Sequence, residues 1–122
     1  MSPVVLIIDD STFARSSLRR YLQNEGYTIK EADSGEKAIE MVAQSSPDII
    51  TLDLLMPGMG GLETMHQIRP LCPKARIVVI TADIQSLTRQ ELISAGADAF
   101  LNKPVSKDEL VKSIHQLLKP TQ

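Results

Sequence analysis

Five polar residues follow four apolar runs of the sequence, and their types suit phosphoryl chemistry. Asp9 and Asp10 follow the run VVLII, Asp53 follows DIITL, Thr81 follows RIVVI and Lys103 follows AFLN. Apolar runs of this kind are typical of strands that are buried on both faces of a parallel sheet. The carboxyl ends of such strands lie along one edge, so residues far apart in the sequence meet there. We therefore expect three carboxylates, a hydroxyl and an ammonium to face one another.

The carboxylates are suited to a hard divalent cation. Mg²⁺ binds through one or two carboxylates, keeps several waters and bridges to phosphate oxygens. Asp9 and Asp10 stand where a strand gives way to a loop, so both can turn toward one ion, one directly and the other through water. Together with Asp53 on a neighbouring strand, they predict a Mg²⁺ site.

Asp53 is the candidate nucleophile because it ends the predicted central strand. A carboxylate can attack phosphorus and form an aspartyl phosphate. Such a transfer needs charge to be neutralised on the equatorial oxygens of the transferred group, by the metal and by fixed cationic or hydroxyl donors. Lys103 and Thr81 are the candidates for those donors.

Each of these residues also has an ordinary structural interpretation. A lone Asp after a strand most often caps a helix or forms a turn, and Asp9 or Asp10 is a candidate cap for a helix beginning near Ser11. Thr81 alone is a good strand former, and Lys103 alone is a solvated surface charge. The functional interpretation is favoured because four of five strand ends carry complementary groups, and clustered carboxylates repel one another unless something compensates them.

The elements that must position these residues alternate along the chain. Strands are predicted at residues 4–8, 28–32, 48–52, 76–80 and 99–102. Helical patterns lie between them, including 34–45 and 86–95, and a capping box at Ser106 and Glu109 begins the last. Four apolar residues are expected on the buried face of the first helix: Phe13, Leu18, Tyr21 and Leu22. Five strands alternating with five helices predict an α/β fold with right-handed crossovers and three layers.

Length and composition narrow the class of protein. The chain has 122 residues, 43% of them hydrophobic and 23% charged, with a formal net charge of −2. The length and composition are typical of one globular domain over residues 1–122. The net charge gives no reason to expect binding to nucleic acid. No apolar run reaches the roughly 20 residues needed to cross a bilayer, and no signal peptide precedes the first strand. We expect a cytoplasmic protein that does not associate with membranes, in which Cys72 is a free thiol in a connecting loop.

Seven short motifs resemble the receiver domain of bacterial two-component response regulators. They are LIIDD at 6–10, DIITLD at 48–53, MP at 56–57, GG at 60–61, TA at 81–82, GAD at 96–98 and KP at 103–104. Each motif alone is weak, but the ordered set is specific and covers essentially the whole chain. The resemblance implies a flavodoxin-like, doubly wound (βα)5 sandwich, with a parallel five-stranded sheet in the order 2-1-3-4-5.

The resemblance also implies a phosphorylation-activated switch. Asp53 would receive a phosphoryl group from a histidine kinase or a histidine phosphotransfer protein. Asp9, Asp10 and Asp53 would hold Mg²⁺, and the backbone carbonyl of Leu55 would be a further ligand. The domain would catalyse only its own phosphorylation and dephosphorylation, so we do not expect an enzyme that acts on other molecules.

The same resemblance implies roles for one residue that binds the phosphoryl group and for two switch residues. Lys103 would bind the phosphoryl oxygens, Thr81 would follow the phosphate inward, and Phe100 matches the aromatic position that turns inward with it. The fourth helix, fifth strand and fifth helix would form the output face, toward a downstream protein target or a fused effector domain. The protein would be a monomer or a phosphorylation-dependent dimer.

Three other functions fit a similar architecture. A flavodoxin-like cofactor carrier is disfavoured, because the first strand leads into acids rather than a glycine-rich phosphate cradle. A Mg²⁺-dependent phosphatase would use the same acids, but no cap domain that could hold a substrate is visible. A phosphorylation-independent interaction module is poorly motivated, because every group needed for the chemistry is present.

Overall fold

The computed structural model describes residues 2–82 and 89–119, and five strands within these ranges form one parallel sheet. The strands are β1 (Val4–Ile8), β2 (Thr28–Ala32), β3 (Ile49–Leu52), β4 (Arg76–Thr81) and β5 (Ala99–Asn102). Their order is β2-β1-β3-β4-β5, which confirms the predicted flavodoxin-like sheet. Because β1 and β3 are neighbours, the residues that follow them lie side by side.

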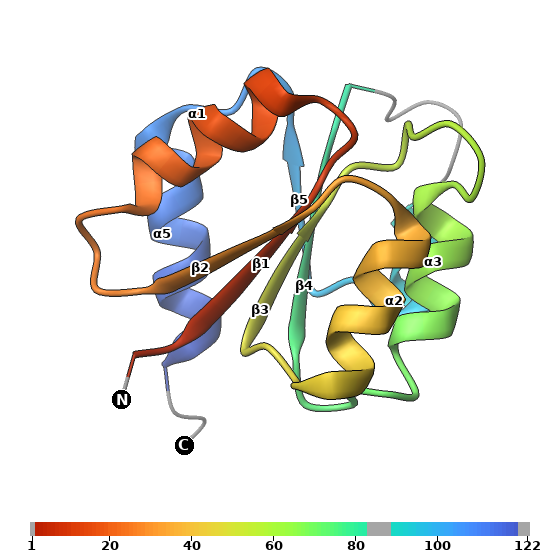
Figure 1. Cartoon of the computed structure of the whole chain (residues 1–122). Coiled ribbons are helices and arrows are strands. Elements are labelled where there is room, and N and C mark those ends of the chain that lie inside the picture. Colours follow the sequence, from red (N-terminus) through yellow and green to blue (C-terminus); the bar gives the residue numbers. More distant parts are fainter. Residues whose placement is uncertain (1, 83–88, 120–122) are drawn as a thin grey trace.

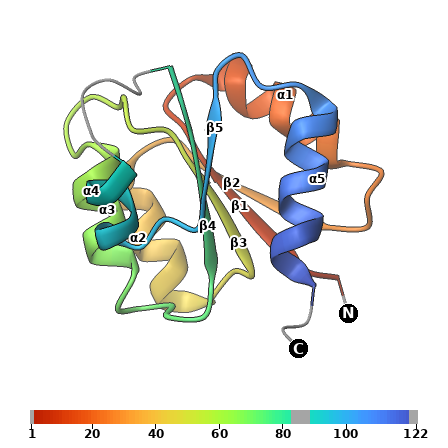
Figure 2. The ribbon, with the colours of Figure 1, turned by 180° about the vertical axis from the view of Figure 1, so that it is seen from behind.

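Helices alternate with the strands along the chain and cover both faces of the sheet, as Figures 1 and 2 show from opposite sides. The helices are α1 (Thr12–Leu22), α2 (Gly35–Gln44), α3 (Gly61–Ile68), α4 (Arg89–Ala95) and α5 (Lys107–Leu118). One face is covered by α1 and α5, and the other by α2, α3 and α4. The start of the fourth predicted helix, residues 86–88, lies outside the described residues. Among the helices that the structure describes, none is long and apolar enough to span a bilayer.

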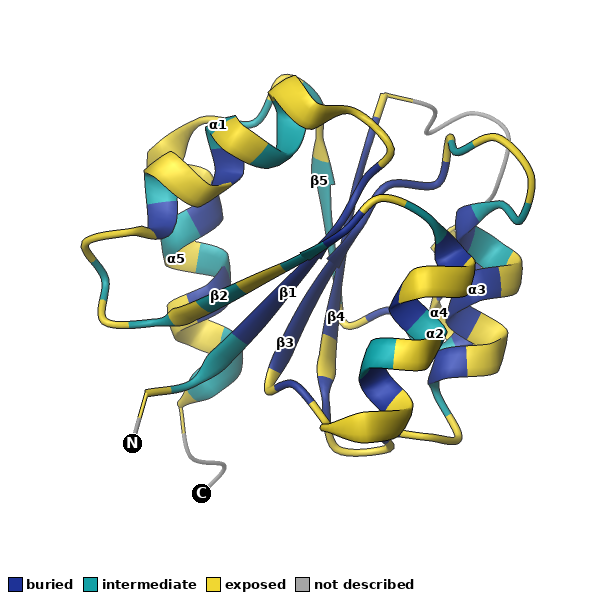
Figure 3. Ribbon diagram, viewed as in Figure 1, coloured by how far each residue is buried: buried dark blue, intermediate teal, exposed yellow. Residues whose placement is uncertain are grey.

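The strands β1, β3 and β4 are apolar on both sides because each face of the sheet lies under helices. Alternate side chains enter the two cores: Ile8 packs with α2, α3 and α4, whereas Ile7 packs with α1 and α5. Figure 3 shows β1, β3 and β4 largely buried and the outer helix surfaces exposed. This burial pattern explains why these three strands are near-continuous apolar runs in the sequence.

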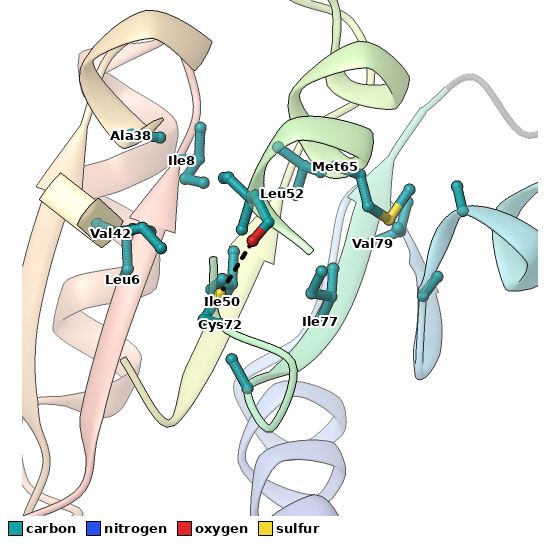
Figure 4. Close-up of a cluster of buried hydrophobic side chains, with 14 of the residues drawn as sticks. Leu6, Ile8, Ala38, Val42, Ile50, Leu52, Met65, Cys72, Ile77 and Val79 are labelled. Carbon is teal, nitrogen blue, oxygen red and sulfur yellow. Dashed lines mark hydrogen bonds between the residues drawn. The ribbon is translucent and has the colours of Figure 1, made fainter. Parts of the chain in front are cut away.

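Cys72 lies in the loop predicted for it, between α3 and β4, and it is also part of the core. Its thiol is free and buried, and it donates a hydrogen bond to the carbonyl of Ile68 at 3.5 Å, drawn dashed in Figure 4. Burial raises the pKa of the thiol, although the nearby charge of Arg69 acts in the opposite direction. Cys72 therefore behaves as a small apolar core residue.

Side-chain oxygens of serine residues cap the N-termini of α1 and α5. The Ser11 hydroxyl accepts the Ala14 amide at 3.1 Å and so caps α1. The predicted capping box at the start of α5 is confirmed, with both of its reciprocal hydrogen bonds present. Since Ser11 caps α1, the alternative assignment of that role to Asp9 or Asp10 is wrong, and both carboxylates are left for other partners.

One prediction for α1 is wrong. Leu18 and Leu22 are buried, but Phe13 is 80% exposed. Nine residues, or two and a half turns, separate Phe13 from Leu22, which places the two side chains on opposite sides of the helix. Phe13 instead lines a groove of about 530 Å³ that includes residues of α1 and of the loop after β5.

Candidate functional site

The carboxyl ends of β1 and β3 hold Asp9 and Asp53 next to each other. Ile8 is paired with Leu52 in the sheet, so both acids directly follow paired residues. The amide of Asp53 donates to the carbonyl of Ile8 at 3.1 Å, which extends the ladder by one residue. The amide of Asp9 in turn donates to the carbonyl of Ala32 on β2 at 3.2 Å. Both carboxylates are therefore carried by backbone that the sheet holds in place.

Asp9, Asp10 and Asp53 form an acidic cluster in which one carboxylate oxygen of each lies within 4.8 Å of the others. Asp9 and Asp53 are only 2% and 6% exposed, whereas Asp10 faces solvent. Mg²⁺ prefers carboxylate oxygens and retains several waters. A cluster that is buried on one side and open on the other meets both requirements, so the three residues fit this ion.

Lys103 bridges the two buried acids. Its Nζ atom lies 2.8 Å from Oδ2 of Asp9 and 2.8 Å from Oδ2 of Asp53. Burial alone would lower the pKa of Lys103, but the hydrogen bonds and negative charges of Asp53 and Asp9 outweigh it and hold that pKa above its ordinary value. The ammonium is therefore protonated at neutral pH and compensates part of the charge of the cluster.

The remaining oxygens of the two buried acids are bound by nearby backbone amides. Oδ1 of Asp9 accepts the amide of Ser11 at 2.9 Å, and Oδ1 of Asp53 accepts the amide of Leu55 at 3.0 Å. Each carboxylate thus has one oxygen on the backbone and the other on Lys103. This pattern fixes the orientation of both carboxylates, and their Oδ2 atoms both face the ammonium of Lys103.

Thr81 and Phe100 lie on the neighbouring strands. Thr81 is buried at the last position of β4 and is paired with Asn102, while its carbonyl accepts the amide of Lys103 at 3.1 Å. Phe100 is half-buried on β5 and packs against the core under α2, α3 and α4. The structure therefore brings Thr81 beside Lys103, and it places Phe100 on the side of the sheet that α4 covers.

Arg15 of α1, which the sequence motifs did not identify, donates a hydrogen bond to the loop after β1. Its Nη1 donates to the backbone carbonyl of Asp9 at 2.7 Å, and its Nε donates to Glu31 at 3.0 Å. One signal was present in the sequence, since Arg15 and Arg19 are four residues apart and share one side of the helix. Their common partner Glu31 comes from β2, so the contact required the tertiary structure.

Comparison with known proteins identifies the family of this chain. A family model described as the response regulator receiver domain matches residues 5–115. The chain belongs to this family. The response regulator MprA of Mycobacterium ulcerans is 39% identical over 122 residues, which make up 100% of this chain and 53% of the relative. The receiver chain thus spans about half the length of the curated relatives it matches.

Solved receiver domains have the same fold. The chemotaxis protein CheY4 of Vibrio cholerae superimposes with a TM-score of 0.90 at 28% identity, covering 97% of this chain and 100% of that one. A response regulator from Burkholderia pseudomallei, solved with a phosphorylated aspartic acid and a calcium ion, has a TM-score of 0.83 at 26% identity, covering 98% of this chain and 76% of that one. These neighbours agree with the sheet order described above.

Membership of the receiver family defines the general function. The receiver domain is a phosphorylation-activated switch of two-component signalling, as the resemblance in the sequence implied. The alternatives of a Mg²⁺-dependent phosphatase and of a phosphorylation-independent module are not favoured by these relatives.

Proposed function

We propose that Asp53 is the phosphoacceptor of this receiver domain and that Asp9 and Asp10 hold Mg²⁺ together with it. The observation that carries the proposal is the acidic cluster, in which oxygens of two buried carboxylates and one exposed carboxylate lie within 4.8 Å of one another. The two buried carboxylates share the ammonium of Lys103. The backbone carbonyl of Leu55 is proposed as a further ligand. The Burkholderia pseudomallei neighbour supports this proposal, since it carries a phosphorylated aspartic acid and a divalent cation.

The proposed reaction is transfer from a phosphohistidine. A carboxylate oxygen of Asp53 attacks phosphorus, a P–O bond forms and the N–P bond of the donor breaks. The electron pair of that bond stays on the ring nitrogen, which takes a proton from water. Bound Mg²⁺ supplies positive charge to the oxygens of the transferred group. Lys103, whose Nζ lies 2.8 Å from Asp53, supplies a second cation at the same place.

Thr81 and Phe100 are proposed to pass the change on to the output face. The phosphoryl group carries about 1.5 to 2 negative charges in place of the single charge of the carboxylate, and it adds strong hydrogen-bond acceptors. A hydroxyl on the adjacent strand end is suited to approach them. Movement of Thr81 would leave room for Phe100 on β5 to turn inward and change the surface near α4. We propose that this surface, together with α5, contacts a downstream protein target or a fused effector domain.

A histidine phosphodonor protein is proposed to dock on the groove beside α1. The groove of about 530 Å³ is lined by apolar residues that include Phe13 and Pro104, and Lys103 also lines it. An exposed Phe at the rim of an apolar groove is typical of a protein-binding surface. Because Lys103 bonds Asp53, a donor that covers the groove would bring its histidine to the acceptor. The cytoplasmic location and the monomer or phosphorylation-dependent dimer remain predictions.

Mass spectrometry after incubation with acetyl phosphate and Mg²⁺ tests the assignment of Asp53. The unchanged protein should gain one phosphoryl group, and Asp53→Asn should gain none. Asp33→Asn is the matched control, because Asp33 is an exposed acid that directly follows β2 at the same edge of the sheet. An unmodified wild-type chain, or uptake that persists in Asp53→Asn, would refute the assignment.

The docking surface is tested by comparing two phosphodonors. Phe13→Ser should slow transfer from a phosphorylated histidine phosphotransfer protein by about 10-fold, the effect of losing a buried aromatic anchor at an interface. Uptake from acetyl phosphate should be unchanged, because this small donor needs no protein interface. Ile93→Ser, which alters an exposed apolar residue on α4, is the control. Equal transfer to all three proteins would contradict docking at α1.

A further inference from the structure

Arg15 connects three parts of the fold next to the acidic cluster. Its side chain is only 13% exposed, and each of its three nitrogen atoms has a hydrogen-bond partner. Nη1 donates to the carbonyl of Asp9 at 2.7 Å, Nε to Oε1 of Glu31 at 3.0 Å and Nη2 to Oγ1 of Thr12 at 3.3 Å. The guanidinium therefore ties the loop after β1 to both α1 and β2.

The carbonyl that Arg15 bonds belongs to the peptide joining Asp9 to Asp10. A peptide is planar, so a bond that holds its carbonyl also fixes the direction in which the chain enters Asp10. Among the residues that the structure describes, no hydrogen bond or ion pair restrains the Asp10 carboxylate. The location of Asp10 relative to the other two acids is therefore set by the backbone, and Arg15 holds that backbone.

Glu31 holds Arg15 in place from β2. Its Oε1 accepts from Arg15, and its Oε2 accepts from Nε of Arg19 at 2.6 Å. The hydrogen bond from Arg19 lowers the pKa of Glu31 most strongly; burial opposes this, and the bond and charge of Arg15 add to the lowering. Glu31 is thus ionised at neutral pH, and charge-assisted bonds to a planar guanidinium restrict its orientation.

We propose that Arg15 is a positioning residue for the Mg²⁺ site, which it serves by orienting the Asp9–Asp10 peptide so that Asp10 joins the other two acids. The inference rests on the proposed function and adds a residue that binds neither the cation nor the phosphoryl group. Partners that orient metal ligands typically contribute 10- to 100-fold to metal affinity. If Arg15 only fastened α1 to β2, its loss would lower stability and leave the affinity of the folded protein unchanged. If its charge repelled the cation, its loss would raise that affinity.

Mg²⁺ titration of the full chain, followed by amide chemical shifts, separates these cases. We expect Arg15→Gln to bind Mg²⁺ about 10-fold more weakly, and Arg15→Lys, whose compact ammonium cannot reproduce the planar fork, to be intermediate. Arg19→Gln is the matched control, because Arg19 bonds the same Glu31 and the carbonyl of Ile29 instead of Asp9. Its Mg²⁺ affinity should equal that of the unchanged protein.

Glu31→Gln provides a second variant if the Arg15 variants do not fold. It leaves Arg15 in the chain but weakens the group that orients it, so Mg²⁺ binding should weaken several-fold. Equal affinity in Arg15→Gln and Arg19→Gln, tighter binding in Arg15→Gln, or no Mg²⁺ binding by any form would overturn the inference. Should no Arg15 variant fold, unaltered affinity in Glu31→Gln would overturn it.

Phosphoryl uptake distinguishes failure of this inference from failure of the proposed function. Arg15→Gln should take up the phosphoryl group of acetyl phosphate slowly at low Mg²⁺ and at nearly the normal rate once Mg²⁺ is saturating, because only the affinity is altered. An unchanged protein that binds Mg²⁺ but takes up no phosphoryl group would refute the role of Asp53. The titrations would still decide the role of Arg15.

Discussion

Gly61 begins α3 directly against the backbone that carries Asp53. A Cβ atom at position 61 would lie 2.6 Å from the carbonyl oxygen of Asp53 and 2.6 Å from the Cα of Leu54. Since both neighbours are backbone atoms, neither can yield without moving the segment that follows β3. The close approach of α3 therefore sets the position of the loop after the proposed phosphoacceptor.

Gly61→Ala is expected to lower the free energy of unfolding by about 1–3 kcal/mol, the usual cost of overpacking. It should also slow phosphoryl uptake, because the backbone at Asp53 has to shift. Urea unfolding and mass spectrometry measure the two effects. Gly60→Ala is the control, since its Cβ would lie 3.9 Å from the nearest atom and its φ of −73° suits any residue. Similar losses in both variants would contradict this explanation.

Lys103→Ala is expected to change Mg²⁺ binding and phosphoryl uptake in opposite directions. The ammonium is hydrogen-bonded to the Oδ2 atoms of Asp9 and Asp53, which are also proposed to face the cation. Its removal should therefore strengthen Mg²⁺ binding by about 10-fold, which corresponds to about a third of the energy of an ion pair near the protein surface. Uptake at saturating Mg²⁺ should slow about 100-fold, as for the loss of one donor to a developing charge. Chemical-shift titration and timed mass spectrometry measure these quantities. Lys74→Ala, in the loop before β4, should alter neither.

Glu31 should make stability depend on pH in the acid range. Its pKa is lower in the folded protein than in the unfolded chain, so its stabilising effect is complete above the ordinary glutamate pKa of about 4.3 and is lost as the pH falls through the lowered value. We expect Glu31→Gln to cost roughly 0.5–1 kcal/mol at pH 7, the range for partly exposed ion pairs. Urea unfolding should show this difference shrinking below about pH 4. A difference that persists at low pH would assign the effect to packing.

Arg89 should restrain Phe100 in its present position. The guanidinium carbon lies 5.4 Å from the centre of the Phe100 ring, a cation–π contact between α4 and β5. Arg89→Gln should lose about 0.5 kcal/mol of this attraction. Beryllofluoride with Mg²⁺ mimics the phosphoryl group. If Phe100 leaves the contact on activation, the beryllofluoride concentration that half-saturates the protein should therefore fall about twofold. Arg89→Lys keeps a cation and should remain close to the unchanged protein. A higher half-saturating concentration in Arg89→Gln would mean that the contact belongs to the active state.

Local sequence was sufficient for the elements and for the residues at their ends. A strand buried on both faces must be apolar throughout, so runs such as VVLII and RIVVI identify strands without knowledge of their neighbours. Polar residues at the ends of such runs then stand out. The capping box at Ser106 and Glu109 was equally local, because its partners are three residues apart.

The exposure of Phe13 could not be read from hydrophobicity. The apolar character of Phe13 predicts a place on the buried face of α1. The rotation of this helix is instead set by Leu18 and Leu22, which pack in the core with residues of α5. Which side of a short helix faces the sheet depends on all of its contacts, and an apolar residue near its start has little weight in that balance. The exposed Phe13 became evidence for a docking surface only once the groove beside it was known.

By itself, the sequence determined the strands, their polar ends and, through the ordered motifs, the receiver family, because burial and helix capping act over a few residues. The tertiary structure alone decided which atoms meet. Lys103 reaches Asp9 across 94 residues and Asp53 across 50. Arg15 of α1 bonds both the carbonyl of Asp9 and the carboxylate of Glu31 on β2. Such hydrogen bonds depend on the twist of the sheet and the rotation of each helix, which follow from packing over the whole fold.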